Sequence, residues 1–90
     1  MPLALLTTTK FEKDFRRVRK QDKDIDKLEK IVDFLQAQQA LPFACRPHLL
    51  HGSWAGHWDC HIESDWLLLY RVTETALILV RTGSHAELFE

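Results

Sequence analysis

HWDCHIESDWLLLYRV, residues 57–72, is the most regular stretch of this 90-residue chain. Polar and apolar side chains alternate strictly in residues 57–63, which is the period of a β-strand with one polar and one apolar face. Residues 63–65 form a short polar turn, and the largely apolar residues 66–72 are typical of a strand in the middle of a sheet. The stretch therefore predicts two consecutive strands joined by a tight turn.

The chain after residue 72 predicts a third strand and a short helix. Thr73-Glu74-Thr75 is a second polar turn, and the apolar residues 76–81 follow it. Thr82-Gly83-Ser84 interrupts this strand, and residues 85–89 have the length of one helical turn. We therefore expect a three-stranded antiparallel meander with a helical turn at the C-terminus.

The segment before residue 20 predicts a strand and a helix. Residues 3–9 are short and apolar and end in three threonines, which favours a strand. Thr9 and Glu12 fit a capping box, in which Thr9 begins the helix and Glu12 reaches back to it. Apolar residues at helical spacing then predict one buried face: Phe11, Phe15 and Val18.

A second helix is predicted after the polar break at residues 21–23. Asp22 or Asp24 can cap it, and Leu41-Pro42 marks the latest point at which it ends. Its apolar stripe is Ile25, Leu28, Ile31, Val32 and Leu35. So short a connection predicts an antiparallel helical hairpin. The order β-α-α-β-β-β makes residues 1–90 a single α+β domain, with this hairpin on one face of a mainly antiparallel sheet.

The composition is that of an ordinary soluble domain, 46% hydrophobic and 28% charged, with a formal net charge of −1. Nine of the twelve Lys and Arg residues lie between Lys10 and Lys30, so the basic charge is local. Residues 10–23 are either a solvated helix face or a flank that contacts RNA phosphates.

The sequence also predicts a compartment. It has no signal peptide, and no apolar run approaches the roughly 20 residues that cross a bilayer. Cys45 and Cys60 lack CxxC spacing, so we expect free, partly buried thiols. These features predict a cytoplasmic protein without a membrane partner.

All five histidines lie in the second half of the chain, at His48, His51, His57, His61 and His85. Imidazole titrates near neutral pH, so such a cluster points to proton transfer or to metal binding. The spacings match no zinc motif and HExxH is absent, so we predict no metal site and no cofactor. The plainer alternative is a polar strand face that only meets water.

Several of these residues can meet on one sheet face. Asp59 and His61 lie two apart on one strand, and the turn after it carries Asp65. Pairing of distant strands can bring the other imidazoles to the same surface. RNA supplies its own 2′-hydroxyl nucleophile, so a base, an acid and a cation suffice to cleave it. The predicted set is His48, His61, Asp65 and His85 for catalysis, with Asp59 and Arg81 as substrate contacts.

Large aromatic residues supply the remaining candidates. Trp54, Trp58 and Trp66 are expected to pack in or near the core. Trp66, beside the turn, is the tryptophan that we expect a nucleobase to reach for stacking. Phe89, next to the C-terminus, either fills the core or stands open to hold a base.

Three linked motifs resemble the YafQ-like branch of the RelE/ParE toxin superfamily. They are HLLHGSW at residues 48–54, WDCHIESDWLLLY at residues 58–70 and RTGSHAELF at residues 81–89. The order and separations of the motifs fit the branch. His51 departs from the pattern, and the near-neutral charge differs from the basic members of the superfamily.

The resemblance implies a RelE-like fold and a bacterial type II toxin. It implies a ribosome-dependent mRNA endonuclease, held inactive by a cognate antitoxin of the ribbon-helix-helix type. His48, His61 and His85 would share the base, acid and phosphate-stabilising roles, Asp59 or Asp65 would orient an imidazole, and Phe89 would position a base.

Other functions stay open at this point. A ParE-like toxin on the same fold would bind a target such as DNA gyrase without cleaving RNA, and such a binder has no need of three histidines. An inactive relative retained for antitoxin pairing and a small metal-binding protein are the other two alternatives.

Overall fold

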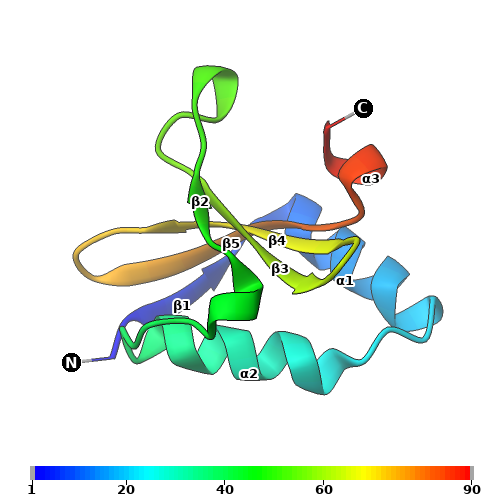
Figure 1. Ribbon diagram of the computed structural model, residues 1–90, viewed down its shortest axis with the longest axis horizontal. Helices are drawn as coiled ribbons and strands as arrows, with labels where there is room; N and C mark the ends of the chain where they lie inside the picture. Colours follow the sequence, from blue (N-terminus) through cyan, green and yellow to red (C-terminus); the bar gives the residue numbers. More distant parts are fainter. Residues whose placement is uncertain (1, 90) are drawn as a thin grey trace.

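A five-stranded mixed sheet, with α1 and α2 packed against one face, forms the body of the molecule (Figure 1). The computed structural model describes residues 2–89. Its elements, in chain order, are β1 (Ala4–Thr7), α1 (Thr9–Lys20), α2 (Ile25–Gln36), η1 (Phe43–Cys45), β2 (His48–Leu49), η2 (Gly52–Trp54), β3 (Trp58–Glu63), β4 (Trp66–Val72), β5 (Ala76–Gly83) and α3 (His85–Phe89), where η denotes a 3-10 turn.

The strand order is β1-β5-β4-β3-β2, with β1 parallel to β5 and all other pairs antiparallel. The predicted α+β class, the meander and the C-terminal helical turn are therefore confirmed. The two-residue strand β2 was not predicted, and β5 continues to Gly83, two residues beyond the expected end.

The hydrophobic core lies between the helices and the sheet. Residues from α1 and α2 pack against alternate residues of β3, β4 and β5: Phe11, Val18, Leu28, Ile31 and Val32 meet Cys60, Leu68, Tyr70, Leu77 and Leu79. Strand β4 is buried on both faces, since Leu67 and Leu69 are as fully covered as their neighbours. Its central position explains why its sequence is almost continuously apolar.

The helix starts follow local capping chemistry. Thr8, and not the predicted Thr9, caps α1: its side-chain oxygen accepts a hydrogen bond from the Phe11 amide at 3.0 Å. The same hydroxyl donates to the Val80 carbonyl at 2.7 Å, which ties the helix start to β5. Asp24 caps α2 as predicted, accepting from the Asp26 amide at 3.1 Å.

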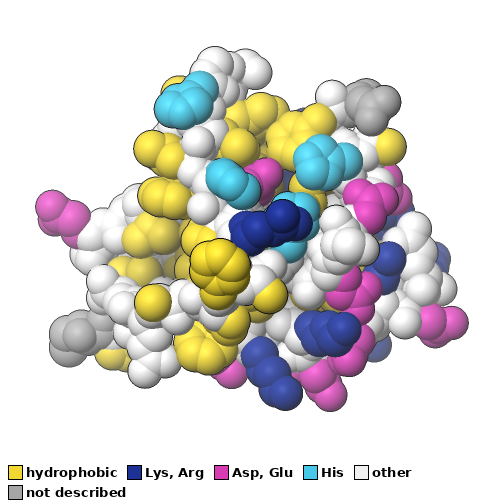
Figure 2. Space-filling view, viewed as in Figure 1, with side chains coloured by type: hydrophobic (Ala, Val, Ile, Leu, Met, Phe, Trp, Pro, Cys, Tyr) yellow, Lys and Arg dark blue, Asp and Glu magenta, His cyan; other side chains and the backbone are white. Residues whose placement is uncertain are grey.

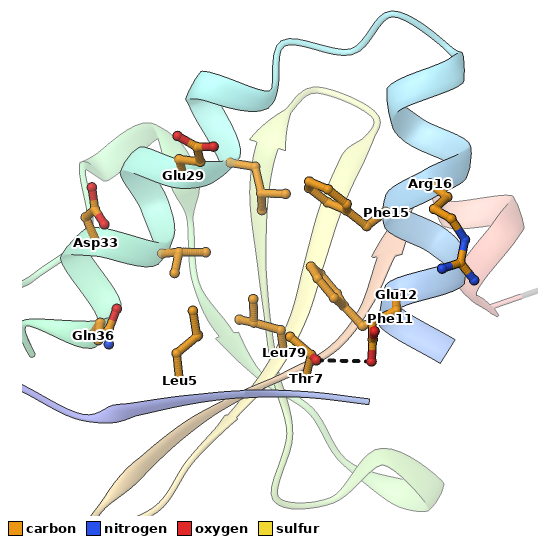
Figure 3. A pocket seen from close by; sticks show the side chains of 12 residues that line it. Leu5, Thr7, Phe11, Glu12, Phe15, Arg16, Glu29, Asp33, Gln36 and Leu79 are labelled. Atoms are coloured by element: carbon orange, nitrogen blue, oxygen red, sulfur yellow. Dashed lines mark hydrogen bonds between the residues drawn. The ribbon is translucent and has the colours of Figure 1, made fainter. Parts of the chain in front are cut away.

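The two helices stand further apart than a closed hairpin would place them. An open groove of about 490 Å³ separates them (Figure 3). Phe11 and Phe15 of α1 form one wall, Glu29 and Asp33 of α2 lie on the other side, and Leu5 lies at its base. No helix within residues 2–89 is long and apolar enough to cross a membrane.

Candidate active site

Strand β3 presents a polar face opposite the helices. Cys60 is fully buried on the core side, and Trp58 and Ile62 pack against the same core. Burial raises the pKa of the Cys60 thiol to about 12, so this thiol stays protonated and is no nucleophile near neutral pH. By the two-residue period of a strand, Asp59 and His61 face the other way, as the sequence pattern predicted.

The short strand β2 brings His48 to this face. His48 is the register partner of Asp59, and His48 Nδ1 lies 3.6 Å from Asp59 Oδ1. This separation is an ion-pair distance, slightly too long for a hydrogen bond. The His48 ring is 64% exposed, whereas the Asp59 side chain is 11% exposed. Asp59 Oδ1 is buried and has no hydrogen-bond partner within residues 2–89.

Helix α3 brings His85 to the same surface. The His61 and His85 ring centroids are 6.4 Å apart. Asp65 Oδ1 accepts a hydrogen bond from the His85 backbone amide at 3.1 Å, so Asp65 holds the residue and not its ring. His61 Nδ1 is buried without a hydrogen-bond partner within residues 2–89. Figure 2 shows histidine side chains gathered on this face, with a basic side chain among them.

An aromatic row continues from His85 along the face. The ring centroids are 5.7 Å apart for His85 and Phe89, 6.3 Å for Phe89 and Trp54, and 5.2 Å for Trp54 and His57. Phe89 is 37% exposed, so it stands open rather than filling the core. Trp54, which the sequence predicts to pack in or near the core, belongs to this row. Trp54 follows the turn-prone Gly52-Ser53, and this loop position is the sequence feature that could have indicated a ring outside the core.

Trp66 does not reach a ligand from its position in the sheet. The side chain is fully buried on the core side, and its indole N–H donates to Thr82 Oγ1 at 2.9 Å. The prediction that Trp66 stacks on a nucleobase is therefore wrong. The two-residue period of β4 places its indole on the opposite face from the histidines.

Arg81 is held by a buried carboxylate. Its guanidinium donates to Asp14 at 2.9 Å through Nε and at 3.0 Å through Nη2. Arg17 and the Thr82 amide donate to the same carboxylate, at 2.8 and 3.2 Å. Burial alone raises the pKa of Asp14, but these hydrogen bonds outweigh it and hold the pKa below its usual value. Arg81 is thus fixed by its ion pair with Asp14, and its role as a phosphate contact stays a prediction.

Helix α3 is anchored to α1 through charged side chains. Arg17 Nε lies 3.1 Å from Glu87 Oε2, and Arg17 Nη2 donates to the Thr82 carbonyl at 2.8 Å. Ser84 and Glu87 form a capping box: each side chain accepts from the other residue's amide, at 3.2 and 2.8 Å. A Cβ on Gly83 would approach Arg17 Nη2 to 2.6 Å, so a larger residue here would displace the Arg17 guanidinium.

The arrangement suits acid–base chemistry. Imidazoles from β2, β3 and α3 share one face with a buried carboxylate and an open aromatic ring. Within residues 2–89, no three His, Cys, Asp or Glu side chains are grouped so as to hold a metal ion. His51 lies in the exposed loop before η2, and within residues 2–89 its side chain forms no hydrogen bond, ion pair or ring contact with this cluster.

Comparisons with known proteins agree with this architecture. A family described as "Bacterial toxin of type II toxin-antitoxin system, YafQ" matches residues 3–90. The mRNA interferase toxin YafQ of Escherichia coli K12 is 40% identical over 80 residues, which cover 88% of this chain and 87% of that protein.

Solved structures give the same result. YafQ in the E. coli DinJ-YafQ toxin-antitoxin complex superposes with a TM-score of 0.92 at 35% identity, covering 100% of both chains. YafQ from E. coli BL21(DE3) superposes with a TM-score of 0.93 at 35% identity, covering 98% of this chain and 99% of that one. The chain therefore belongs to the YafQ family of bacterial toxins from type II toxin–antitoxin systems.

Proposed function

We propose that this toxin is an endoribonuclease that cleaves mRNA on the ribosome by metal-independent acid–base catalysis, and that a cognate antitoxin neutralises it. The observation that carries the proposal is the meeting of His48, His61 and His85, from three separate elements, on one sheet face beside Asp59. The E. coli relative, an mRNA interferase toxin, supports the substrate class.

The reaction needs two proton transfers. A base removes the 2′-hydroxyl proton, the 2′-oxygen attacks the adjacent phosphorus, and the bond from phosphorus to the 5′-oxygen breaks. An acid protonates the departing 5′-oxygen, which leaves a 2′,3′-cyclic phosphate and a free 5′-hydroxyl. Because RNA supplies the nucleophile and imidazoles carry the protons, no metal-bound hydroxide is required.

The geometry suggests how the roles divide. His48 is the best-supported base, because Asp59, 3.6 Å away, stabilises the positive charge that the ring gains. His85 is exposed, lies beside His61 and precedes the open ring of Phe89 by one helical turn. It is therefore placed to give a proton to the leaving oxygen while Phe89 stacks on a base.

Growth arrest and primer extension on cellular mRNA test the proposal. We expect His85→Ala to abolish both arrest and in-frame mRNA cleavage, while the protein stays folded. His51→Ala is the matched control and should act like the wild type, because His51 lies outside the cluster. Full toxicity of His85→Ala, or loss of toxicity in both variants, would contradict the proposal.

Metal independence has its own test. A phosphorothioate in place of a non-bridging oxygen of the scissile phosphate slows a metal-assisted reaction, and a thiophilic metal ion restores it. We expect no such rescue by Mn²⁺ or Cd²⁺. Rescue would show that a metal ion contacts the phosphate.

The groove between α1 and α2 offers a surface for the antitoxin. Leu5, Phe11 and Leu79 line its apolar part, and Glu12 and Arg16 lie at its edge. An amphipathic helix of the antitoxin would bury its apolar face there. The solved DinJ-YafQ complex supports pairing with an antitoxin, and we expect a partner of the ribbon-helix-helix type.

Two neighbouring leucines of β1 test this surface. Leu5 is 43% exposed and lines the groove, whereas Leu6 is 51% exposed and does not. We expect Leu5→Asp to weaken antitoxin binding in a titration calorimeter and Leu6→Asp to leave it nearly unchanged. Equal affinities for the two variants would place the antitoxin elsewhere.

A further inference from the structure

We propose that Arg46 binds the scissile phosphate of the RNA and stabilises its transition-state charge. This proposal rests on the proposed nuclease function. Arg81 pairs with Asp14, whereas Arg46 is a basic residue without such a partner that lines one hollow together with His61.

Arg46 sits next to the imidazole cluster at the edge of β3. It follows η1 directly and lines, together with Cys45, His61 and Ser64, a hollow of about 420 Å³. His61 thus belongs both to this hollow and to the imidazole cluster where we place the RNA.

The charge of Arg46 is available to a ligand. Its side chain is exposed and has no ion pair or hydrogen bond within residues 2–89. Glu63 is the carboxylate among the described residues that line the hollow, and it pairs with Lys27 at 2.9 Å. Glu63 thus has its own cation partner, and no carboxylate within residues 2–89 forms an ion pair with Arg46.

The backbone of Arg46 is in an unfavourable conformation for arginine. Its φ is +43° and its ψ is +64°, in the left-handed region that glycine adopts more readily. The turn is closed by the Arg46 amide, which donates to the Phe43 carbonyl at 3.2 Å. Folding alone would therefore be better served by glycine, so the arginine side chain points to a function.

The chemistry fits a phosphodiester. A guanidinium donates two parallel hydrogen bonds to the non-bridging oxygens of a phosphate. His61 lines the same hollow, and its buried Nδ1 has no hydrogen-bond partner within residues 2–89. A phosphate held between the two would receive a fixed positive charge where negative charge develops.

The variant Arg46→Gly tests the role of Arg46 in cleavage separately from its role in folding. Glycine suits the left-handed backbone, so we expect the melting temperature to stay the same or rise. We expect kcat on ribosome-bound mRNA to fall by about 100-fold with little change in KM, as when a transition-state donor is removed. Free guanidinium ion should restore part of kcat, and Arg46→Lys should keep part of it.

Two further variants make the outcome decisive. Lys30→Gln removes one exposed positive charge from α2, on the other side of the sheet, and should cleave like the wild type. If His85→Ala abolishes cleavage while Arg46→Gly retains the full rate, the Arg46 proposal fails and the nuclease function stands. If kcat is unchanged and only KM rises, or guanidinium restores nothing, Arg46 does not stabilise the transition state. If the wild type does not cleave mRNA, the proposed function itself fails.

Discussion

Asp59 places a buried carboxylate beside the exposed ring of His48. A buried carboxylate oxygen without a hydrogen bond costs free energy, and the exposed ring of His48, 3.6 Å away, compensates only in part. Asp59→Asn removes this buried charge and keeps the shape of the side chain. We expect the free energy of unfolding to stay the same or rise by about 1 kcal/mol. We expect kcat to fall by roughly 100-fold, because the charge on His48 loses its partner.

Urea denaturation and single-turnover cleavage by the purified Asn variant check this pair of effects. A less stable protein that cleaves at the wild-type rate would show that Asp59 serves the fold and not the reaction.

Single residues also show where sequence reasoning succeeds and where it fails. The face shared by Asp59 and His61 follows from the two-residue period of a strand, which is a local property, whereas the sequence left both positions of Phe89 open. The buried partner of Arg81 does not follow from a local property, because Asp14 lies 67 residues away and only the packing of α1 on β5 joins them. The prediction for Trp66 failed because a residue next to a turn can point to either face of the sheet, and the sequence does not show which.

Among the elements, α3 depends most on its surroundings. A helix of five residues is not stable alone, so its position relies on Asp65, on the capping box and on Arg17. Glu87→Gln keeps the capping box and removes the ion pair with Arg17. We expect faster amide exchange in α3 and a several-fold loss of kcat, with less than about 1 kcal/mol lost in stability because the pair is partly exposed.

Hydrogen exchange and cleavage rates measured together test this anchoring. Glu74→Gln, in the exposed turn between β4 and β5, is the matched control and should change neither quantity. If both variants exchange alike in α3, the ion pair does not position His85.

The elements that were predicted and those that were missed differ in length. Strands β3 and β4 and both long helices have enough residues to show a period. Strand β2 has two residues, and it exists because His48 and Leu49 pair with Asp59 and Trp58. A pattern cannot reveal such a strand, although it is the strand that delivers His48 to the site.

The whole molecule joins its two layers through the Asp14 network, which predicts its behaviour in acid. The pKa of Asp14 is lowered in the folded state, so its contribution to stability is present above the ordinary value of 3.8. That contribution is lost as the pH falls through the lower, folded pKa. The lowered pKa of Glu87, caused first by the Ser84 amide, acts with the same sign.

We therefore expect the free energy of unfolding to fall steeply below about pH 4. A carbon NMR titration of the Asp14 carboxyl checks the cause directly, because it reports the folded pKa. A value at or above 3.8 would show that the hydrogen bonds from the two arginines do not outweigh burial.

The sheet also separates two surfaces of the molecule. The groove between α1 and α2 lies on the core side, where Leu79 faces, and the histidines lie on the other side. In the proposed function, the antitoxin binds one face of this small sheet and the RNA binds the other.

In the proposed mechanism, three imidazoles act together on one phosphodiester. The most direct measurement is the single-turnover rate of mRNA cleavage on the ribosome for His48→Ala, His61→Ala, His85→Ala, their pairs and the control His51→Ala. We expect each of the first three to lose about 100- to 10,000-fold. Each pair should lose little more than its worse member, because groups that act as a unit are not additive. Rates near the wild type for two of the three, or an equal loss in His51→Ala, would contradict the assignment.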